Sequence, residues 1–257
     1  MKDFATGVKF LGLGLRRIAR RPRLALLGII PAVLSLLLFI GLFVLLFYFL
    51  GDLSEAATWF AKDWSAAWRT TVEVAAGVAI VGVAALLAVI SFTAVTLLIG
   101  DPFYEAIAES IEDELGGVPG EVEFSVWSSL RRSLADSLRL MLITIVIGIP
   151  LFFLGLIPLV GQTVVPVIAA FIAGWFLSVE LVGIPFHRRG LRLPDRRRML
   201  RQHRATALGF GVAVFLCFLI PLGAVLIMPA AVAGGALLTR HIFGQSTSPT
   251  PSAADRE

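Results

Sequence analysis

The sequence predicts an all-α integral membrane protein with two long transmembrane helices, two proline-broken helical hairpins that partly or fully penetrate the membrane, and amphipathic cytoplasmic helices. Composition is the first observation: 58% of the residues are hydrophobic and 16% are charged, whereas soluble globular chains carry about 25% charged residues. The second is that four stretches lack acidic, basic and histidine side chains and are each long enough to cross a bilayer. They are residues 24–51, 74–100, 140–179 and 205–239.

Positive charge is concentrated in two segments beside these apolar stretches. Residues 1–23 hold seven basic side chains against Asp3 alone, and residues 188–204 hold eight arginines against Asp195 alone. Basic clusters next to apolar stretches mark the cytoplasmic face of a membrane protein. We therefore expect a multi-pass membrane protein with both termini in the cytoplasm. The first apolar stretch is too long for a cleavable signal peptide and is expected to stay as a helix.

The first two apolar stretches predict the two long transmembrane helices. The first helix is expected to begin after Arg23, and the second is expected to return the chain to the cytoplasm. Between them, residues 52–73 contain four acidic residues and three tryptophans. Tryptophan is enriched where a membrane meets water. This segment is therefore interpreted as a periplasmic loop or helix with an aromatic belt, in preference to a ligand-stacking site.

A charged amphipathic helix is predicted to follow the second apolar stretch. Asp101 can cap exposed N–H groups and Pro102 is favoured at the first helical position, so a helix start is expected here. Apolar side chains then recur every four residues, at Phe103, Ile107, Ile111 and Leu115. The carboxylates on the other faces are interpreted as a solvated surface in preference to a metal or acid-base site. They are Glu105, Glu109, Glu112 and Asp113. A second amphipathic stretch is expected over residues 127–139.

The third and fourth apolar stretches are too long for one crossing each and are interrupted by proline and glycine. Pro158 and Gly161 interrupt the third, and Pro221 and Gly223 interrupt the fourth. Each stretch is predicted to fold back as a helical hairpin. The arms before the prolines hold about 16 to 18 residues, or roughly 24 to 27 Å of helix, marginally short of the roughly 30 Å hydrocarbon core. Irregular backbone at a hairpin tip cannot face lipid, so a homo-oligomer is expected to cover it.

The domain organisation is expected to be simple. Residues 1–245 are predicted to form a single membrane domain. Residues 246–257 contain Ser, Thr, Pro, Asp and Arg without apolar periodicity and are predicted to be a disordered C-terminal tail. Cys217 is the lone cysteine, so no intrachain disulfide is possible.

Four segments, in order along nearly the whole chain, carry a family resemblance. They are the sequence IPLVGQTVVPV at residues 157–167, Pro102-Phe103 continuing through Ala108-Glu109 and Glu112, Pro185-Phe186, and residues 220–234. Together they resemble the CysZ sulfate permease family, which shares a superfamily with the etoposide-induced endoplasmic reticulum membrane protein. The resemblance implies two long transmembrane helices plus two hairpins, assembled as an oligomer. It also implies a location in the bacterial plasma (inner) membrane and uptake of sulfate or a related oxyanion through it for cysteine synthesis.

Arginines near the first long helix are the candidate oxyanion-binding residues: Arg20, Arg21 and Arg23. Guanidinium groups donate paired hydrogen bonds to oxyanions, and helix starts attract anions. The alternative is a topology signal that contacts anionic lipid headgroups. The family's motif at this place is Pro-Gly-Leu/Ile-Arg/Lys, associated with sulfate binding, and here Arg23 stands at the glycine position and Ala25 at the basic position.

Polar residues within the first hairpin are candidates for a pore or hairpin-tip site: Gln162, Thr163 and Glu180. Transporters place substrate contacts at the tips of broken helices, and ionisable groups within a membrane are functional candidates. Alternatively, Gln162 and Thr163 satisfy the interrupted backbone, and Glu180 forms an interfacial ion pair with Arg188 or Arg189.

No motif for catalysis or cofactor binding is found in the sequence. It contains no Ser-His-Asp set, zinc-ligand spacing, phosphate loop or dinucleotide fingerprint. We therefore expect no enzymatic activity, metal or cofactor. The basic segments lack interleaved aromatics, so nucleic-acid binding is not expected. Two functional hypotheses remain: a permease for sulfate or a related oxyanion, with anionic lipids as further partners, and a non-transporting membrane scaffold or lipid-interacting protein that keeps the fold without the oxyanion site.

Overall fold

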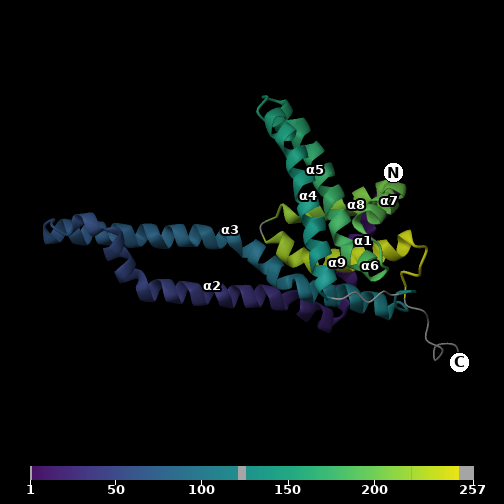
Figure 1. The fold of residues 1–257 in the computed structure, drawn as a ribbon, viewed down its shortest axis with the longest axis horizontal. Coiled ribbons are helices and arrows are strands. Elements are labelled where there is room, and N and C mark those ends of the chain that lie inside the picture. The colour runs from purple at the N-terminus through teal and green to yellow at the C-terminus, as the bar shows by residue number, and fades with distance from the viewer. Residues whose placement is uncertain (1, 121–125, 221, 249–257) are drawn as a thin grey trace. The chain divides into compact units, whose positions relative to one another are not determined.

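The computed structural model describes residues 2–120, 126–220 and 222–248, apart from the side chains of 126–137, 139 and 140. All the regular elements in these residues are helices, in agreement with the predicted all-α class (Figure 1). In chain order they are α1 (Lys2–Arg20), α2 (Pro22–Ala57), the short 3-10 helix η1 (Trp59–Ala61), α3 (Ala66–Glu114), α4 (Val126–Gly155), α5 (Val160–Leu181), α6 (Gly183–Arg188), α7 (Leu193–Gln202), α8 (Arg204–Phe218) and α9 (Gly223–Ile242).

The chain forms two compact units. Met1–Gly28 and Phe103–Glu257 make up the first unit, and Ile29–Pro102 makes up the second. Within the described residues, α2, α3, α5 and α9 are long and apolar enough to cross a membrane. This matches the membrane class predicted from the four apolar stretches.

The second unit consists of the apolar parts of α2 and α3 and the connection between them. Most of their large apolar side chains are exposed, including Leu37, Phe47 and Leu86. Exposure of this extent is unfavourable in water, because a contiguous apolar surface of this kind is stable only against lipid or protein. Trp59 and Trp64 in the connection and Trp68 in the first turn of α3 are also exposed, as expected for an aromatic belt.

The predicted helix start at Asp101 and Pro102 is wrong. Helix α3 runs without interruption from Ala66 to Glu114, and Pro102 lies inside it. A proline within a helix removes one backbone hydrogen bond, but long helical segments flank this position on both sides and the helix continues through it. The amphipathic helix predicted from residue 103 is therefore the last part of α3.

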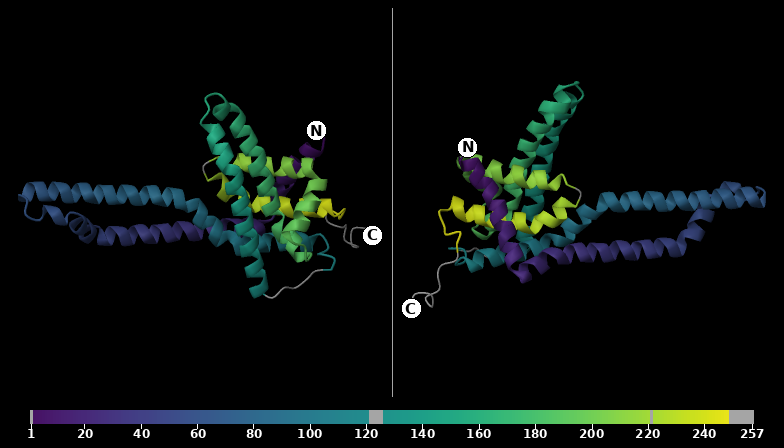
Figure 2. Two further views of the ribbon diagram at one scale, coloured as in Figure 1. Left: turned by 45° about the horizontal axis from the view of Figure 1, so that its top comes forward. Right: turned by 180° about the vertical axis from the view of Figure 1, so that it is seen from behind.

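Both predicted hairpins are present in the first unit. The first joins α4 to α5 and the second joins α8 to α9 (Figure 2). In each tip a leucine adopts a left-handed backbone conformation, Leu159 with φ 68° and Leu222 with φ 61°, which is rare for a residue with a side chain. A glycine follows each leucine closely. A Cβ at Gly161 would collide with the carbonyl oxygen of Gly155, and one at Gly223 with that of Cys217.

The second hairpin forms much of the core of the first unit. Nearly all of α9 from Pro229 to Arg240 is buried. Helix α5 lies against α8, where the buried Ser178 hydroxyl donates a hydrogen bond to the carbonyl oxygen of Ala207 at 2.5 Å. On the other side, α1 crosses both α8 and α9 (Figure 2).

Helix α1 was not predicted, because residues 1–23 were interpreted only as a basic segment. Its buried positions are Gly7, Phe10, Gly14 and Ile18, which recur every three or four residues and define one face. The glycines permit close contact between helices. A Cβ at Gly7 would lie 2.7 Å from the backbone nitrogen of Phe210, and one at Gly14 would lie 2.7 Å from that of Gly234. The basic side chains occupy the remaining faces of an otherwise packed helix.

Candidate functional site

An acidic turn at the end of α3, residues Glu112, Asp113 and Glu114, binds arginines from several parts of the chain. Glu112 pairs with Arg189 at 2.9 Å, and Asp113 pairs with Arg188 at 2.8 Å. Glu114 accepts a hydrogen bond of 2.5 Å from Arg21. Arg17 also lies 3.9 Å from Glu114. The acidic turn therefore links α1, the junction between α1 and α2, and the C-terminal end of α6.

The Glu112–Arg189 pair is buried, and the interpretation of Glu112 as part of a solvated surface is wrong. The Glu112 side chain is 0% exposed and that of Arg189 is 5% exposed. Nη1 of Arg189 donates to both carboxylate oxygens of Glu112 at 2.9 Å. Nη2 donates to Oε1 of Gln245 at 2.8 Å, and the guanidinium lies 5.0 Å from the ring centroid of Phe243. Such extensive pairing is needed because two charges removed from water lose most of their hydration.

Arg240 of α9 closes the C-terminal end of α3. Its side chain is buried and donates to the carbonyl oxygens of Leu115 at 2.6 Å and Gly117 at 3.0 Å. The last carbonyl groups of a helix have no partner within the helix, and a cation satisfies them both by hydrogen bonding and by its interaction with the helix dipole. Gly116 and Gly117, which directly follow Leu115, have positive φ values that glycine adopts readily.

The structure thus brings both basic segments to one place. Arg17 and Arg21 come from the N-terminal segment, and Arg188 and Arg189 come from the second segment. The two basic segments are evident in the sequence, but their common acidic partner was not predicted. The missed signal is that Glu112 follows Tyr104 and Ala108 at four-residue intervals, on the buried side of the helix.

The three arginines predicted to bind an oxyanion lie where α1 ends and α2 begins. Arg21 separates the two helices, and its carbonyl oxygen accepts the first α2 hydrogen bond, from the N–H of Ala25 at 3.0 Å. The guanidinium of Arg21 is occupied by Glu114. Arg20 and Arg23 are exposed on either side of it. Pro22 is the first residue of α2, where its missing N–H removes no helical hydrogen bond.

The candidates within the first hairpin are not brought together. Gln162 and Thr163 are exposed beside the tip, and Glu180 is exposed at the opposite end of α5. Eighteen residues of helix between positions 162 and 180 correspond to about 27 Å. The Thr163 hydroxyl donates to the carbonyl oxygen of Leu159 at 2.5 Å. This bond satisfies the interrupted backbone, which is the alternative role considered for Thr163.

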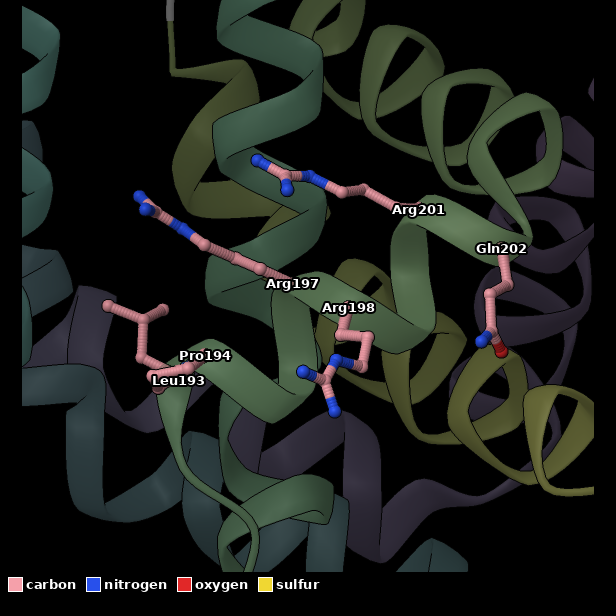
Figure 3. A pocket seen from close by; sticks show the side chains of 6 residues that line it. All are labelled: Leu193, Pro194, Arg197, Arg198, Arg201 and Gln202. Atoms are coloured by element: carbon pink, nitrogen blue, oxygen red, sulfur yellow. The ribbon is translucent and has the colours of Figure 1, made fainter.

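Helix α7 contains the central part of the second basic segment and borders a cavity of about 520 Å³. The lining residues are Leu193, Pro194, Arg197, Arg198, Arg201 and Gln202 (Figure 3). Arg196 is buried instead, and it donates to the carbonyl oxygen of Val179 at 3.0 Å. Arginines that are neighbours in sequence therefore have different roles. Among the residues that the structure describes, no group of three or more His, Cys, Asp or Glu side chains is arranged to hold a metal ion.

The chain matches a known protein family over most of its length. Residues 10–229 match the EI24 family, described as sulfate transporter CysZ/etoposide-induced protein 2.4. The chain belongs to this family. The matched EI24 region includes the acidic turn, the whole first hairpin, α7, α8 and the start of α9. It confirms the family resemblance carried by the four sequence segments.

Several curated relatives in the EI24 family are named sulfate transporter CysZ. That of Vibrio parahaemolyticus is 33% identical over 145 residues, which cover 56% of this chain and 59% of the relative. One from Pseudomonas fluorescens strain Pf-5 is 35% identical over 151 residues, covering 57% and 60%. Another, from strain Pf0-1, is 29% identical over 238 residues, covering 90% and 92%. The chain thus matches about three fifths of the first two relatives and nearly the full length of the third.

Proposed function

We propose that this protein is a permease that carries sulfate or a closely related oxyanion across the bacterial inner membrane for sulfur assimilation. The observation that carries the proposal is the match over 90% of the chain to a protein named sulfate transporter CysZ. Four apolar helices of membrane-spanning length within the described part of the chain support it. The positive-inside bias supports placing both termini, the N-terminal basic segment and α7 in the cytoplasm.

Arg20 and Arg23 are proposed to attract and bind the oxyanion at the cytoplasmic side. Both residues are exposed. Arg23 lies in the first turn of α2, where the helix dipole adds positive potential, and Arg20 is the last residue of α1. Guanidinium donates paired hydrogen bonds to the oxygen atoms of a tetrahedral oxyanion. Arg21 is proposed to have a different role, because its bond to Glu114 fixes the α1–α2 junction and thereby the positions of its two neighbours.

The hairpin tips support a homo-oligomeric permease. Leu159 and Leu222 are exposed at the two tips, and irregular backbone at membrane depth is stable only when it is covered by protein or lines water. A second copy of the chain supplies such cover. Gln162, beside the first tip, is proposed to line the polar path, and Glu180 to form its mouth at the other end of α5. Anionic lipids are proposed to contact the exposed arginines of both basic segments.

Transport is tested by reconstitution. Liposomes containing the full-length protein are expected to take up radiolabelled sulfate faster than protein-free liposomes of the same lipid composition. Excess unlabelled sulfate should suppress the uptake of label, whereas equimolar chloride should not. Equal rates with and without protein would contradict the permease and favour a membrane scaffold without transport.

Replacing the two exposed arginines tests the oxyanion site. The double variant R20Q/R23Q is expected to need about tenfold more sulfate for half-maximal uptake, because each lost charge-assisted hydrogen bond weakens binding substantially. The control K2Q/K9Q removes the same number of charges from exposed positions of the same basic segment. Uptake should be measured as a function of sulfate concentration for both variants. An unchanged half-saturation in R20Q/R23Q, or an equal rise in K2Q/K9Q, would exclude a specific role for Arg20 and Arg23.

A further inference from the structure

The segment that follows α9, residues 243–248, folds back over the end of that helix and is named the strap. Gly244 has a φ value of 65°, which glycine adopts readily. Its N–H donates to the carbonyl oxygen of His241 at 3.0 Å, and the N–H of Gln245 donates to that of Arg240 at 2.8 Å. These two hydrogen bonds form the Schellman pattern of a helix that ends at a glycine. The end of α9 therefore turns the strap back toward Arg240.

The strap binds arginine side chains through neutral oxygen atoms. It accepts hydrogen bonds from three arginines, which belong to α1, to the C-terminal end of α6 and to α9. The bonds are Nη2 of Arg189 to Oε1 of Gln245 at 2.8 Å, Nε of Arg240 to the carbonyl oxygen of Ser246 at 2.7 Å, and Nη2 of Arg17 to the carbonyl oxygen of Thr247 at 3.4 Å. The sequence of the strap contains no acidic residue. It therefore supplies hydrogen-bond acceptors to the three arginines but no negative charge.

The arginines under the strap carry more positive charge than their carboxylate partners balance. Glu112 and Glu114 form the ion pairs with these arginines, and Glu114 is shared with Arg21. In the described part of the chain, all the hydrogen bonds of Arg240 go to main-chain oxygen atoms. Four arginines thus face two carboxylates. Charges that are removed from water lose hydration and interact strongly with one another, so the surplus positive charge favours binding of an anion.

Two N–H positions of these arginines also lack an acceptor. Nε of Arg189 and Nη1 of Arg17 are buried and have no hydrogen-bond partner among the described residues. The Arg189 side chain is only 5% exposed, and that of Arg17 is 14% exposed. A buried donor without an acceptor is unfavourable, and more so when it belongs to a charged group. An anion with several acceptor oxygens can satisfy these donors and supply the missing negative charge.

We propose that Arg17, Arg189 and Arg240 form a second oxyanion site, which the strap occupies when the anion is absent. Sulfate displaces the strap oxygens and takes their place on the guanidinium groups. Guanidinium forms stronger hydrogen bonds with a charged oxyanion than with a neutral oxygen, and the doubly charged anion also balances the surplus positive charge. The site is distinct from Arg20 and Arg23. It rests on the proposed function only in the choice of sulfate as its ligand.

Release of the strap is measured with a spin label at position 248 of the full-length protein. The substitution Cys217→Ala removes the lone cysteine, and Ser248→Cys provides the labelling site. Ser248 is exposed, and the hydrogen bonds it forms within the strap use only its main-chain groups. In detergent-solubilised protein, the label is expected to be immobilised without sulfate and to become mobile as sulfate is added. Chloride at the same ionic strength should leave it immobilised.

Gln245→Ala tests whether the strap and sulfate exclude each other. The substitution removes the side-chain acceptor of Arg189 from the closed strap alone, and a hydrogen bond to a charged group contributes substantially to the closed state. The apparent affinity for an anion rises with the fraction of molecules in which the strap is open. The sulfate concentration for half-release is therefore expected to fall about tenfold. The matched control is Gln202→Ala, at an exposed position of α7, which should leave this concentration unchanged.

Arg17→Gln tests the anion site itself. Arg17 contributes one positive charge and an N–H group without an acceptor, whereas Arg21 keeps Glu114 paired when Arg17 is replaced. The bond from Arg17 to the strap is long at 3.4 Å, so its loss weakens the site more than it weakens the strap. The concentration for half-release is expected to rise about tenfold. Lys9→Gln removes one exposed charge from the same helix and should leave it unchanged.

The proposal is supported if sulfate mobilises the label and the variants Gln245→Ala and Arg17→Gln shift the half-release concentration in opposite directions. R20Q/R23Q should leave that concentration unchanged. Loss of the response in R20Q/R23Q but not in Arg17→Gln would assign it to the proposed transport site and overturn the second site. A label that is mobile without sulfate, that sulfate fails to mobilise even in Gln245→Ala, or that chloride mobilises equally also overturns it. These measurements involve no transport, so failure of the permease is recognised separately, by liposome uptake.

Discussion

Replacing Glu112 by glutamine is expected to destabilise the protein by about 3–5 kcal/mol, as for other buried ion pairs that lose one partner. Glutamine keeps the size of the side chain and one acceptor oxygen but leaves the charge of Arg189 without a carboxylate. Since both side chains are almost completely buried, water cannot replace the lost partner. For a chain of this size, the expected fall in Tm is on the order of 10 °C. Thermal unfolding of the detergent-solubilised protein measures it.

The matched control is Glu109→Gln, which neutralises an exposed carboxylate one turn earlier in α3. It is expected to change Tm by only a few degrees, because exposed charges contribute little to stability. A second comparison uses the double variant E112L/R189M. Replacing both members of a buried pair with apolar groups removes the uncompensated charge, so this variant should be more stable than the sum of its single substitutions predicts. Equal changes in Tm for Glu112→Gln and Glu109→Gln would show that the buried ion pair stabilises the protein no more than an exposed carboxylate does.

The features that could be predicted from the sequence depend on short-range signals. The length of an apolar stretch determines whether it can cross a membrane, and a proline and glycine pair such as Pro158 and Gly161 determines where a long stretch turns back. These signals led to α2, to the main part of α3 and to both hairpins. The helix start predicted at Pro102 was wrong because this signal is also local. A proline is favoured in the first turn of a helix, but it can also lie inside a long helix, as Pro102 does in α3.

The partners of charged side chains could not be predicted from the sequence, because they depend on contacts between distant segments. Glu112 and Arg189 are separated by 77 residues, and Arg240 lies a further 51 residues along the chain. Nothing local distinguishes Arg196, which anchors α7, from the exposed Arg198. The burial of Glu112 does have a local signal, since it shares a helical face with Ala108.

The predicted membrane domain of residues 1–245 stays a prediction. Of the predicted tail, residues 249–257 lie outside the described residues, while the carbonyl oxygen of Ser246 accepts a 2.7 Å hydrogen bond from Arg240.

Replacing glycine by alanine at two positions of α1 is expected to change the stability of the protein in opposite directions. Gly14 faces α9 so closely that a Cβ would collide with the carbonyl oxygen of Ala230 and lie 2.7 Å from the backbone nitrogen of Gly234. Backbone atoms cannot rotate away as a side chain can, so Gly14→Ala must separate the helices, at a cost of about 1–3 kcal/mol or more. Gly12 has no atom within 4 Å of its would-be Cβ. Gly12→Ala should stabilise the helix by up to about 1 kcal/mol, because alanine has the higher helix propensity.

The variants Gly14→Ala and Gly12→Ala also test the proposed function. Helix α1 ends at Arg20, so a shift of α1 away from α9 also moves the exposed arginines and the bond between Arg21 and Glu114. Gly14→Ala is therefore expected to lower both Tm and the rate of sulfate uptake, whereas Gly12→Ala should preserve the rate and maintain or raise Tm. Thermal unfolding and liposome uptake of the two variants provide the measurements. If Gly14→Ala lowered Tm but left uptake unchanged, the α1–α9 contact would be purely structural, and Arg20 and Arg23 would not need to be held in place. If both variants behaved alike, α1 would not pack against α9 through Gly14.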